Sequence, residues 1–476
     1  MEDEFRHKII IDPVHGDIGL SKLETELIDT PTFQRLKGIK QLGFAHTVYP
    51  SARHTRFEHS LGVMHIMGRI LESLRSKDKS YVSEDDFRKL RIAALLHDIG
   101  HYPYSHLMER IDWDSAQKYI SKKGQSEGGE TSLPKEYPKH DKLGEIVITK
   151  RKDIKEKLER NKIDPLDIAA LVRGQHQSII PNLLNASLDV DRLDYLVRDS
   201  LNTGLPYGKV DLNYLVNNLE LTDEKELVVR AKARSSIEHM LMGRYFMFNT
   251  VYMHKTVFAF EEMIRKIVLT LWEKGKIYRS GEEIEEMARA DSDDFLAFDD
   301  GYLDKLIDKY ASSKKDKQLA ALCKAVKLRK PPKLVYEISE LTWDNSPPSE
   351  KYTILRTKWG AKFKEFAKDT EIKIPEERWI FSDIKGAEFE KLHPFMSLAE
   401  AREFSESKGP ELRELVKIKE RSGKPKILVT DKSSVLHYMS RLKPTLCRIY
   451  VIGIDDASAG RIRTKIERWL KSEEKI

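Results

Sequence analysis

The chain has 476 residues, more than one compact core needs and suited to a large catalytic domain with a smaller appendage. It is 40% hydrophobic and 34% charged, and its formal net charge of +6 is small against 83 basic residues. The sequence lacks a run of 18 apolar residues, starts with an acidic stretch rather than a signal-like one, and contains only Cys323 and Cys447. We therefore expect a cytoplasmic protein without a membrane span, a disulfide scaffold or a cysteine zinc site.

The N-terminal part predicts a hairpin followed by helices. Apolar runs on either side of a turn at Pro13 and Gly16 predict two short strands. Beyond them, apolar residues recur at helical spacing. The predicted strands cover residues 8–11 and 18–20, and the predicted helices cover about residues 21–28, 31–42, 60–76 and 83–99. A polar, glycine-rich stretch at about 112–138 predicts a surface excursion.

The rest of the chain predicts further helices and then a mixed C-terminal part. Helical spacing continues over about residues 140–160, 165–173, 178–200, 212–220, 235–273, 302–328 and 457–471. Strand-like runs are at 226–230, 372–374, 379–381, 426–429 and 448–452, and a linker signal is at 345–349. We predict a mainly α fold divided into residues 1–285, a helical extension at 286–345 and a smaller α/β C-terminal lobe at 346–476.

One stretch combines three imidazoles and a carboxylate within ten residues. An apolar helical run ends in the adjacent pair His97 and Asp98, stops near Gly100, and is followed by His101 and His106. A buried His-Asp pair costs desolvation energy unless a cation neutralises it, and these ligand types suit Mn, Fe, Zn, Ni or Mg. Taken alone, the pattern fits a capped helix end with surface histidines equally well.

Two further clusters favour the metal interpretation. Residues 53–62 place cations and imidazoles immediately before an apolar helix, and residues 189–199 contain aspartates at i, i+2, i+5 and i+10. A helix so rich in aspartate is normally avoided in a core, because like charges repel and lose hydration. The three segments together therefore indicate a divalent-cation site rather than surface histidines.

The three segments, in this order, form an H…HD…D pattern, and shorter motifs accompany it. These are Asp-Pro-Val-His-Gly at 12–16, Asp-Thr-Pro-Thr-Phe-Gln-Arg-Leu at 29–36, Lys-Gln-Leu-Gly at 40–43 and Arg-Phe-Glu-His-Ser-Leu-Gly at 56–62. Together they resemble the HD-domain deoxynucleoside triphosphate (dNTP) triphosphohydrolases, the branch of the SAM-and-HD-domain enzymes of animals and their prokaryotic relatives. The resemblance is strong over about residues 8–260 and faint beyond about 340. It implies an HD-domain helical core within residues 1–285 and a hydrolase that converts a dNTP to deoxynucleoside and tripolyphosphate.

The resemblance also implies a metal site, with the ligands His59, His97, Asp98 and Asp191. Asp191 is preferred to Asp189 because it occupies the ligand position of the Asp-Val-Asp-Arg motif. Such a set leaves coordination positions for a water and a phosphate oxygen. The metal stays open among Mn, Fe, Zn, Ni and Mg, and Mg is also expected to accompany the nucleotide. His106 and His140, assisted by His101, match the family's catalytic histidines over the triphosphate, where imidazole can act as acid or base.

Substrate contacts follow from the same resemblance. The matching triphosphate contacts are Arg56, Arg192, Tyr195 and Arg244, and guanidinium groups suit phosphate oxygens. Gln41 and Asp199 match the pair that binds the 3′-hydroxyl, and Tyr252 matches a residue that stacks on the sugar and leaves no room for a 2′-hydroxyl. Met253 and Phe248 replace a glutamine and a histidine of the family, so deoxyribose selection is implied less firmly than phosphohydrolase chemistry.

Part of a regulatory site is matched as well. In the animal enzyme, nucleotides bind between subunits and lock an assembly. Residues that hold an activating guanine nucleotide are matched by Lys8, Asp29, Gln34 and Lys37. The basic set around a neighbouring dNTP is matched by Arg230, Lys232, His254, Lys255, Arg329 and Lys333. Ile11 replaces a polar contact and Lys37 replaces an arginine, which weakens the case for guanine specificity. The resemblance implies a homo-oligomer, dimer or tetramer, with GTP or a dNTP as allosteric activator; the alternative is dispersed surface charge.

Two rival functions stay open. An HD-type nuclease or nucleic-acid-binding protein would use the basic segments at 314–317, 327–330 and 417–421, but acids interrupt two of them and no aromatic residues are interleaved for base stacking. An HD phosphodiesterase or phosphatase acting on another nucleotide would have no use for a 3′-hydroxyl clamp.

Overall fold

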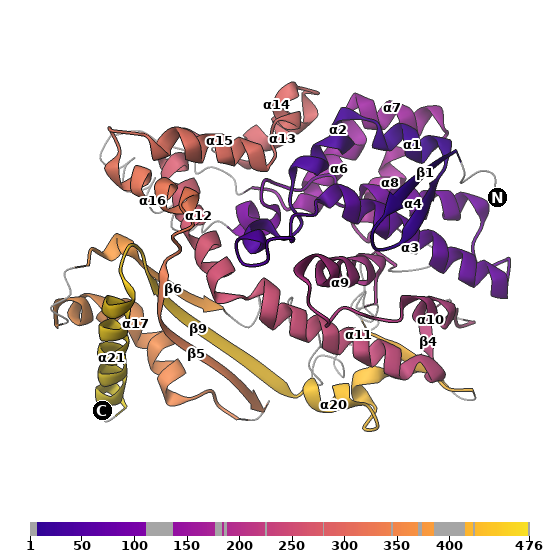
Figure 1. Cartoon of the computed structure of the whole chain (residues 1–476). Helices are drawn as coiled ribbons and strands as arrows, with labels where there is room; N and C mark the ends of the chain where they lie inside the picture. The colour runs from indigo at the N-terminus through magenta and orange to yellow at the C-terminus, as the bar shows by residue number, and fades with distance from the viewer. Residues whose placement is uncertain are drawn as a thin grey trace.

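The structure is a computed structural model in which most of the chain is described. The described residues are 7–110, 137–176, 183–184, 188–223, 226–278, 280–343, 346–369, 374–384, 415–421 and 424–474. The excursion predicted at about 112–138 and the strand predicted at 372–374 lie almost wholly outside them. Figure 1 shows a larger helical part and, away from the N-terminus, a sheet flanked by helices. The prediction of a mainly α fold with a smaller α/β C-terminal lobe is confirmed.

The chain opens with the predicted hairpin. Strand β1 (Lys8–Asp12) pairs in antiparallel register with β2 (Gly16–Leu20), whose residues Ile18 and Leu20 are buried in the main core. Gly16 has a φ of 72°, a left-handed conformation that glycine adopts without strain. Helix α1 (Lys22–Ile28) follows, as predicted.

Two long helices carry the first site residues. Helix α3 (Arg56–Lys77) and helix α4 (Glu84–Leu96) pack against each other and agree with the predictions at 60–76 and 83–99. The single helix predicted at 31–42 is wrong: α2 (Pro31–Gln34) tightens into the 3₁₀ turn η2 (Arg35–Gly38). It ends there because Lys40 forms a β-bridge with Thr55, which requires extended backbone. The 3₁₀ turn η3 (Gly43–Thr47) precedes α3.

The middle of the chain is helical, but several predicted helices are divided. The helices are α6 (His140–Lys150), α7 (Lys152–Arg160), α8 (Pro165–Val172), α9 (Val190–Thr203), α10 (Leu212–Asn217), α11 (Arg234–Met247), α12 (Lys255–Glu273), α13 (Gly281–Arg289), α14 (Asp293–Leu296), α15 (Asp300–Ala311) and α16 (Lys317–Lys327), with the turns η4 (Ser105–Arg110) and η5 (Ala231–Ala233). The helix predicted at 140–160 breaks at Arg151, and the helix predicted at 235–273 is interrupted by the π turn η6 (Phe248–Tyr252). The helix predicted at 212–220 ends at Asn217, because Leu219 enters a strand.

The C-terminal part forms two sheets that return to the helical part. Strands β5 (Lys333–Trp343), β9 (Leu442–Val451) and β6 (Trp379–Ile384) form an antiparallel sheet in the order β5-β9-β6. Strands β3 (Leu219–Leu221), β4 (Leu227–Arg230), β7 (Lys417–Lys419) and β8 (Lys426–Ile427) form the second sheet, in which β4 pairs with β7 across almost 200 residues. The remaining elements are α17 (Glu350–Asp369), η7 (Glu376–Arg378), η9 (Leu428–Thr430), α20 (Val435–Met439) and α21 (Asp456–Glu473).

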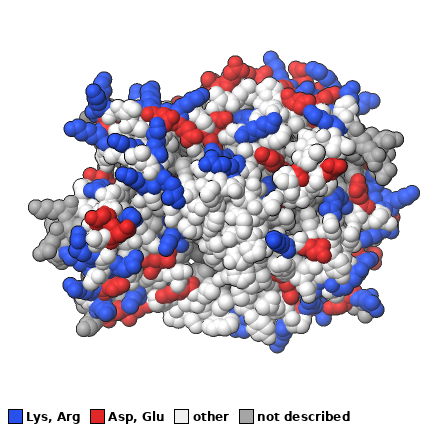
Figure 2. All heavy atoms as spheres, in the orientation of Figure 1, with Lys and Arg blue, Asp and Glu red and all other residues white. Residues whose placement is uncertain are grey.

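The sheet β5-β9-β6 has a buried residue set on each face. Trp359 of α17 and Ile462 of α21 belong to the core on one face. Phe258 of α12 and Tyr450 of β9 belong to the core on the other, which joins the lobe to the helical part. None of the described helices is long and apolar enough to cross a membrane. On the face shown in Figure 2, basic and acidic side chains alternate around the margins and the middle carries few charges, so this face has no continuous basic patch.

Candidate metal centre and substrate pocket

Three elements bring four side chains to one point. His59 lies on α3, His97 and Asp98 directly follow α4, and Asp191 lies in the first turn of α9. Nε2 of His59 lies 2.8 Å from Oδ1 of Asp191 and 3.6 Å from Oδ2 of Asp98. Nε2 of His97 lies 3.3 Å from Oδ1 of Asp98 and 3.8 Å from Oδ1 of Asp191. The residues assigned from the H…HD…D pattern therefore surround a single small volume.

The two imidazoles are presented as metal ligands usually are. Among the described residues, no hydrogen-bond donor reaches Nε2 of His59 or of His97, although both atoms are buried. Nδ1 of His59 is held 2.7 Å from Oδ2 of Asp194, and Nδ1 of His97 is held 2.8 Å from the carbonyl oxygen of Ala94. A ring fixed through Nδ1 directs the lone pair of Nε2 toward a cation. With two carboxylates, this donor set fits Mn, Fe, Zn, Ni or Mg.

The charges of the cluster also favour a cation. Burial alone would raise the pKa of Asp98, but the Arg56 guanidinium, 2.7 Å from Oδ2, and the adjacent imidazoles hold that pKa well below its usual value. Burial opposes protonation of His59, but bonds to Asp191 and Asp194 raise its pKa to about 10. The buried His59 ring thus lies between the carboxylates of Asp191 and Asp194, whose negative charge must be balanced by a positive charge. A divalent metal supplies that charge in place of a proton.

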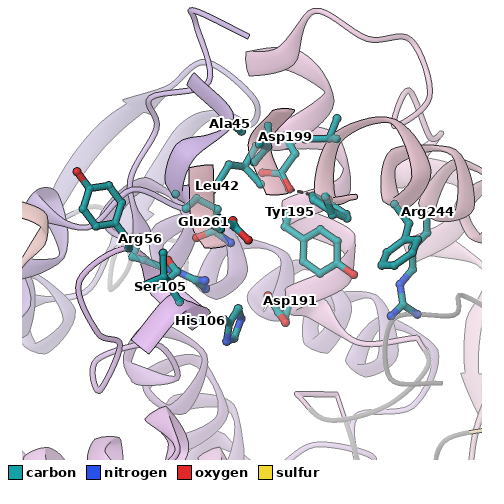
Figure 3. A pocket seen from close by; sticks show the side chains of 18 residues that line it. Leu42, Ala45, Arg56, Ser105, His106, Asp191, Tyr195, Asp199, Arg244 and Glu261 are labelled. Carbon is teal, nitrogen blue, oxygen red and sulfur yellow. Dashed lines mark hydrogen bonds between the residues drawn. The ribbon is translucent and has the colours of Figure 1, made fainter. Parts of the chain in front are cut away.

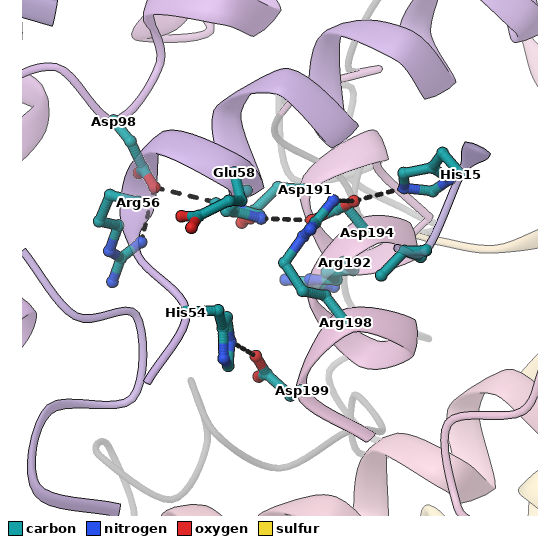
Figure 4. A network of polar contacts seen from close by, with 12 residues as sticks. His15, His54, Arg56, Glu58, Asp98, Asp191, Arg192, Asp194, Arg198 and Asp199 are labelled. Carbon is teal, nitrogen blue, oxygen red and sulfur yellow. Dashed lines mark hydrogen bonds and ion pairs between the residues drawn. The ribbon is translucent and has the colours of Figure 1, made fainter. Parts of the chain in front are cut away.

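A buried network behind the metal ligands centres on Asp194 (Figure 4). Its Oδ1 accepts a hydrogen bond from Nε2 of His15 at 2.6 Å, and its Oδ2 accepts one from His59. Arg198 donates to Asp194 at 2.8 and 3.0 Å and to Oδ2 of Asp12 at 2.8 Å. The sequence analysis did not assign Asp194 a role. The available signal was helical spacing, since Asp194 lies three residues after Asp191 and faces the same side of α9.

The three predicted catalytic histidines lie together beside Asp98. Nε2 of His101 is 3.1 Å from Oδ1 of Asp98, and the His101 ring stacks on the His140 ring with centroids 4.1 Å apart. Glu109 joins the other two, with Oε1 2.8 Å from Nδ1 of His140 and Oε2 3.0 Å from Nδ1 of His106. Sequence reasoning missed Glu109, although it follows His106 by three residues on η4.

His140 reaches this cluster because the turn after α4 approaches helix α6 very closely. A Cβ atom on Gly100 would lie 2.2 Å from the backbone nitrogen of Gly144 and 2.2 Å from the carbonyl oxygen of His140, so glycine is required there. Burial disfavours a charged His140, but the hydrogen bond to Glu109 and the negative charges of Glu109 and Asp98 together outweigh burial and raise its pKa. Burial would raise the pKa of Glu109, yet bonds to His106 and His140 hold it far below its usual value.

A pocket of about 230 Å³ opens beside Asp191 (Figure 3). The predicted residues among its lining are Gln41, Arg56, His106, Asp191, Tyr195, Asp199, Arg244 and Tyr252. The hydroxyl of Tyr252 donates to Oδ2 of Asp199 at 2.7 Å, while His54, which the sequence analysis did not single out, lies 2.8 Å from Oδ1. Gln41 has a buried Oε1 without a hydrogen-bond partner in the described structure, so this oxygen is available to a ligand hydroxyl.

Arg192, a predicted phosphate contact, is not among the residues that line the pocket. Nε of Arg192 lies 3.7 Å from Oδ2 of Asp189. Asp189 caps α9 by accepting a hydrogen bond from the backbone nitrogen of Arg192 at 2.7 Å, a local structural role. Burial raises the pKa of Asp189 to about 7, against the opposing charge of Arg192.

The residues matched to regulatory nucleotides lie on separate parts of the molecule. Lys8 of β1 lies 3.5 Å from Asp29, Arg230 of β4 pairs with Glu220, and Arg329 after α16 donates to the carbonyl oxygen of Thr47 at 2.8 Å. Figure 1 places β1, β4 and α16 well apart. Because Arg230 and Arg329 both belong to the set matched to a dNTP, a single copy of the chain does not gather that set around one ligand.

Family comparisons agree with this geometry. Residues 56–199 match the HD domain, and residues 210–319 match an HD-associated region. The first match begins at Arg56 and ends at Asp199, so it contains all four converging side chains. Residues 56–199 therefore form an HD domain, the domain that defines a superfamily of metal-dependent phosphohydrolases.

Several known proteins are similar to the chain. It is 32% identical over 275 residues to the deoxynucleoside triphosphate triphosphohydrolase SAMHD1 of Bos taurus, which covers 54% of this chain and 46% of that protein. It is 31% identical over 309 residues to an uncharacterized protein of Methanocaldococcus jannaschii, and the match covers 63% of this chain and 58% of that protein. The chain spans about half the length of the curated relatives it matches.

A solved structure resembles the chain over nearly its whole length. The crystal structure of a hypothetical protein from Aquifex aeolicus matches with a TM-score of 0.63 and 25% identity, covering 96% of this chain and 99% of that one. The resemblance therefore includes the C-terminal lobe as well as the HD domain.

Proposed function

We propose that the chain is a metal-dependent dNTP triphosphohydrolase that releases deoxynucleoside and tripolyphosphate. The observation that carries the proposal is the convergence of His59, His97, Asp98 and Asp191 beside a pocket that also contains Arg56 and Arg244. The pocket thus combines a metal donor set with guanidinium groups that suit a polyphosphate. The similarity to a protein named as a dNTP triphosphohydrolase supports the same substrate class.

The four donor residues would hold the metal, and the pocket cations would orient the triphosphate. A divalent ion at this position would polarise the α-phosphorus–oxygen bonds and favour attack by water there. Arg56 pairs with Asp98 and also lines the pocket, so its guanidinium can contact a phosphate that reaches the metal centre. Arg244 is buried and lines the same pocket.

The histidine cluster supplies the proton transfers of such a reaction. Glu109 raises the pKa of His140, so His140 is suited to give a proton to the leaving 5′-oxygen. Burial and the nearby Arg56 charge lower the pKa of His101 well below its usual value, so this ring stays neutral beside Asp98. His106 lines the pocket and provides a second imidazole beside the substrate.

The sugar would be recognised through its 3′-hydroxyl. Gln41 and Asp199 line the pocket and offer oxygens that can accept a hydrogen bond from the 3′-hydroxyl. The bond from Tyr252 to Asp199, 2.7 Å long, fixes the phenol ring over the sugar position. A ring held there would exclude a 2′-hydroxyl, which favours dNTPs over NTPs.

We also propose that the chain acts as a homo-oligomer, dimer or tetramer, in which GTP or a dNTP binds between copies and activates hydrolysis. The separation of Arg230 from Arg329, both matched to one dNTP, supports an inter-subunit site, because a second copy would be needed to bring them to the same ligand. Sedimentation with and without nucleotide tests the assembly.

The decisive experiment is product analysis by anion exchange after incubation of each dNTP and NTP with the metal-loaded protein. Tripolyphosphate and deoxynucleoside should appear together in a single step. A double variant, His97→Ala with Asp98→Ala, should lose bound metal and turnover while keeping its helical circular dichroism. Orthophosphate or pyrophosphate as the primary product would assign the chain to another HD-domain activity.

A further inference from the structure

Asp199 is held by a hydrogen-bond donor at each of its two carboxylate oxygens. It is only 1% exposed, yet it lines the substrate pocket. Its Oδ2 accepts a hydrogen bond from the hydroxyl of Tyr252 at 2.7 Å, and its Oδ1 lies 2.8 Å from Nε2 of His54. A carboxylate held at one oxygen can still turn about its last side-chain bond, whereas one held at both oxygens keeps a single orientation. His54 therefore supplies half of the contacts that orient Asp199.

The His54 ring is the donor in its contact with Asp199. An ionised carboxylate accepts hydrogen bonds and donates none, so the ring carries a proton on Nε2. Nδ1 of His54 is buried and has no hydrogen-bond partner in the part of the chain that the structure describes, so no second hydrogen bond competes for the ring. Tyr252 is the other donor, because burial and the Asp199 charge raise the pKa of its hydroxyl well above the usual value and keep it protonated.

The backbone of His54 holds the other residue proposed to bind the 3′-hydroxyl. The carbonyl oxygen of His54 accepts a hydrogen bond from the backbone nitrogen of Gln41 at 3.0 Å. The neighbouring residues Lys40 and Thr55 form the β-bridge between the same two segments. One residue is thus bonded to both members of the proposed sugar-binding pair, to Asp199 through its side chain and to Gln41 through its backbone.

His54 does not itself form part of the pocket wall. It is 7% exposed and is not among the residues that line the pocket. Figure 4 shows its ring directed from the segment before α3 toward Asp199 on α9. His54 therefore acts on a ligand in the pocket through Asp199 and Gln41 and not by direct contact.

We propose that His54 is a positioning residue for recognition of the 3′-hydroxyl: its side chain orients the Asp199 carboxylate, and its backbone places Gln41 beside it. The inference rests on the proposed dNTP hydrolysis and adds a residue that sets sugar specificity. A site built to hydrogen-bond a hydroxyl rejects an analogue without it by as much as about 10⁴-fold, and a displacement of about 1 Å costs about 100-fold. Loss of the His54 donor should therefore reduce discrimination at the 3′ position by about tenfold or more.

The test is a competition assay on the metal-loaded full chain. dATP and an excess of its 2′,3′-dideoxy analogue ddATP are incubated in one reaction, and deoxyadenosine and dideoxyadenosine are quantified. The product ratio, corrected for the input ratio, gives the ratio of kcat/KM for two substrates that share base and triphosphate. This ratio does not depend on the fraction of folded protein, and any activating nucleotide acts on both substrates in the same tube.

Three substitutions of His54 differ in whether a donor reaches Asp199. His54→Leu has no donor and His54→Asn has an amide that is too short, so both should lower the dATP/ddATP ratio by about tenfold or more. His54→Gln can place its amide nitrogen near the position of Nε2 and should keep a ratio close to that of the wild type. A loss of stability alone would lower total turnover without changing the ratio.

The matched control is His437→Leu, the same change at another buried histidine. His437 is also 7% exposed, and its Nδ1 lies 2.9 Å from the carbonyl oxygen of Val429. It is not among the residues that line the pocket. His437→Leu should therefore leave the dATP/ddATP ratio unchanged.

The outcomes separate the two proposals. Wild-type ratios in His54→Leu and His54→Asn would overturn the role of His54 and leave the proposed function standing. A ratio in His54→Gln as low as in His54→Leu would also overturn that role, because the hydrogen bond would not be the cause. A wild type that hydrolyses dATP and ddATP equally well would overturn the inference but not the release of tripolyphosphate. A wild type that hydrolyses no dNTP would overturn the proposed function, and the role of His54 with it.

Discussion

Replacing Asp194 by asparagine should weaken both the fold and the metal centre. Asp194 is fully buried and accepts hydrogen bonds from His15, His59 and Arg198 at 2.6 to 3.0 Å. Asparagine has the same size but no charge, so among the described residues Asp12 would remain as the carboxylate partner of Arg198. Removing one partner of a buried ion pair costs about 3–5 kcal/mol, and the remaining Asp12 contact places the expected loss near ~3 kcal/mol.

The effect on the metal is separate and smaller. Asp194 fixes the His59 ring through Nδ1, and outer partners of this kind change metal affinity about 10- to 100-fold. The asparagine oxygen can still accept the His59 proton, so we expect a loss close to tenfold, or about 1.4 kcal/mol. Urea denaturation of the metal-free protein measures the first effect, and titration with Mn²⁺ measures the second.

A matched control separates metal binding from general stability. Asp300 is also buried, pairs with Lys40 at 3.0 Å and has no contact with the four proposed metal ligands among the contacts of the described chain. Asp300→Asn should lower the denaturation midpoint and leave Mn²⁺ affinity unchanged. If Asp194→Asn kept the wild-type midpoint and the wild-type Mn²⁺ affinity, the network of Figure 4 would have no supporting role and the reasoning would be wrong.

Two further predictions concern the histidine cluster. Gly100→Ala should destabilise the protein by about 1–3 kcal/mol and lower kcat by roughly 100-fold, because the added Cβ must push the backbone at His140 away. Thermal unfolding measures the loss of stability, and steady-state kinetics measures kcat. A wild-type kcat in this variant would show that His140 needs no close placement. Glu109→Gln should move the alkaline limb of the pH–rate profile to lower pH, since the bond to Glu109 raises the pKa of His140 and keeps it protonated as pH rises. An unmoved limb would exclude His140 as the proton donor.

The sequence predicted secondary structure best where the signal depends only on neighbouring residues. The turn at Gly16 and the apolar stripes of α3 and α4 predicted the hairpin and both helices, because those signals depend on neighbouring residues. The helix predicted at 31–42 was wrong because the bridge between Lys40 and Thr55 overrides local propensity. β5 was not predicted either, since its partner β9 begins about a hundred residues later.

The same distinction applies to the site. The sequence pattern and the family resemblance selected the donor set, and the structure brings those four side chains together. Helical spacing places Asp194 on the same side of α9 as Asp191, but its bond to His15, which lies 179 residues away, could not be predicted from the sequence. Glu261 carries no motif, and only the fold places it in the pocket. Long-range packing, not local pattern, determines which polar side chains meet.

The two departures from the family pattern around Tyr252 have a structural explanation. Phe248 and Met253 are buried in the core that joins η6 and α12 to the sheet β5-β9-β6, where apolar residues suit the contact better than histidine or glutamine. The sheet also holds the backbone that follows Tyr252, because Arg448 donates to the carbonyl oxygen of Met253 at 2.7 Å. The C-terminal lobe therefore positions Tyr252, and through its bond to Asp199 it fixes the part of the pocket proposed to select the sugar.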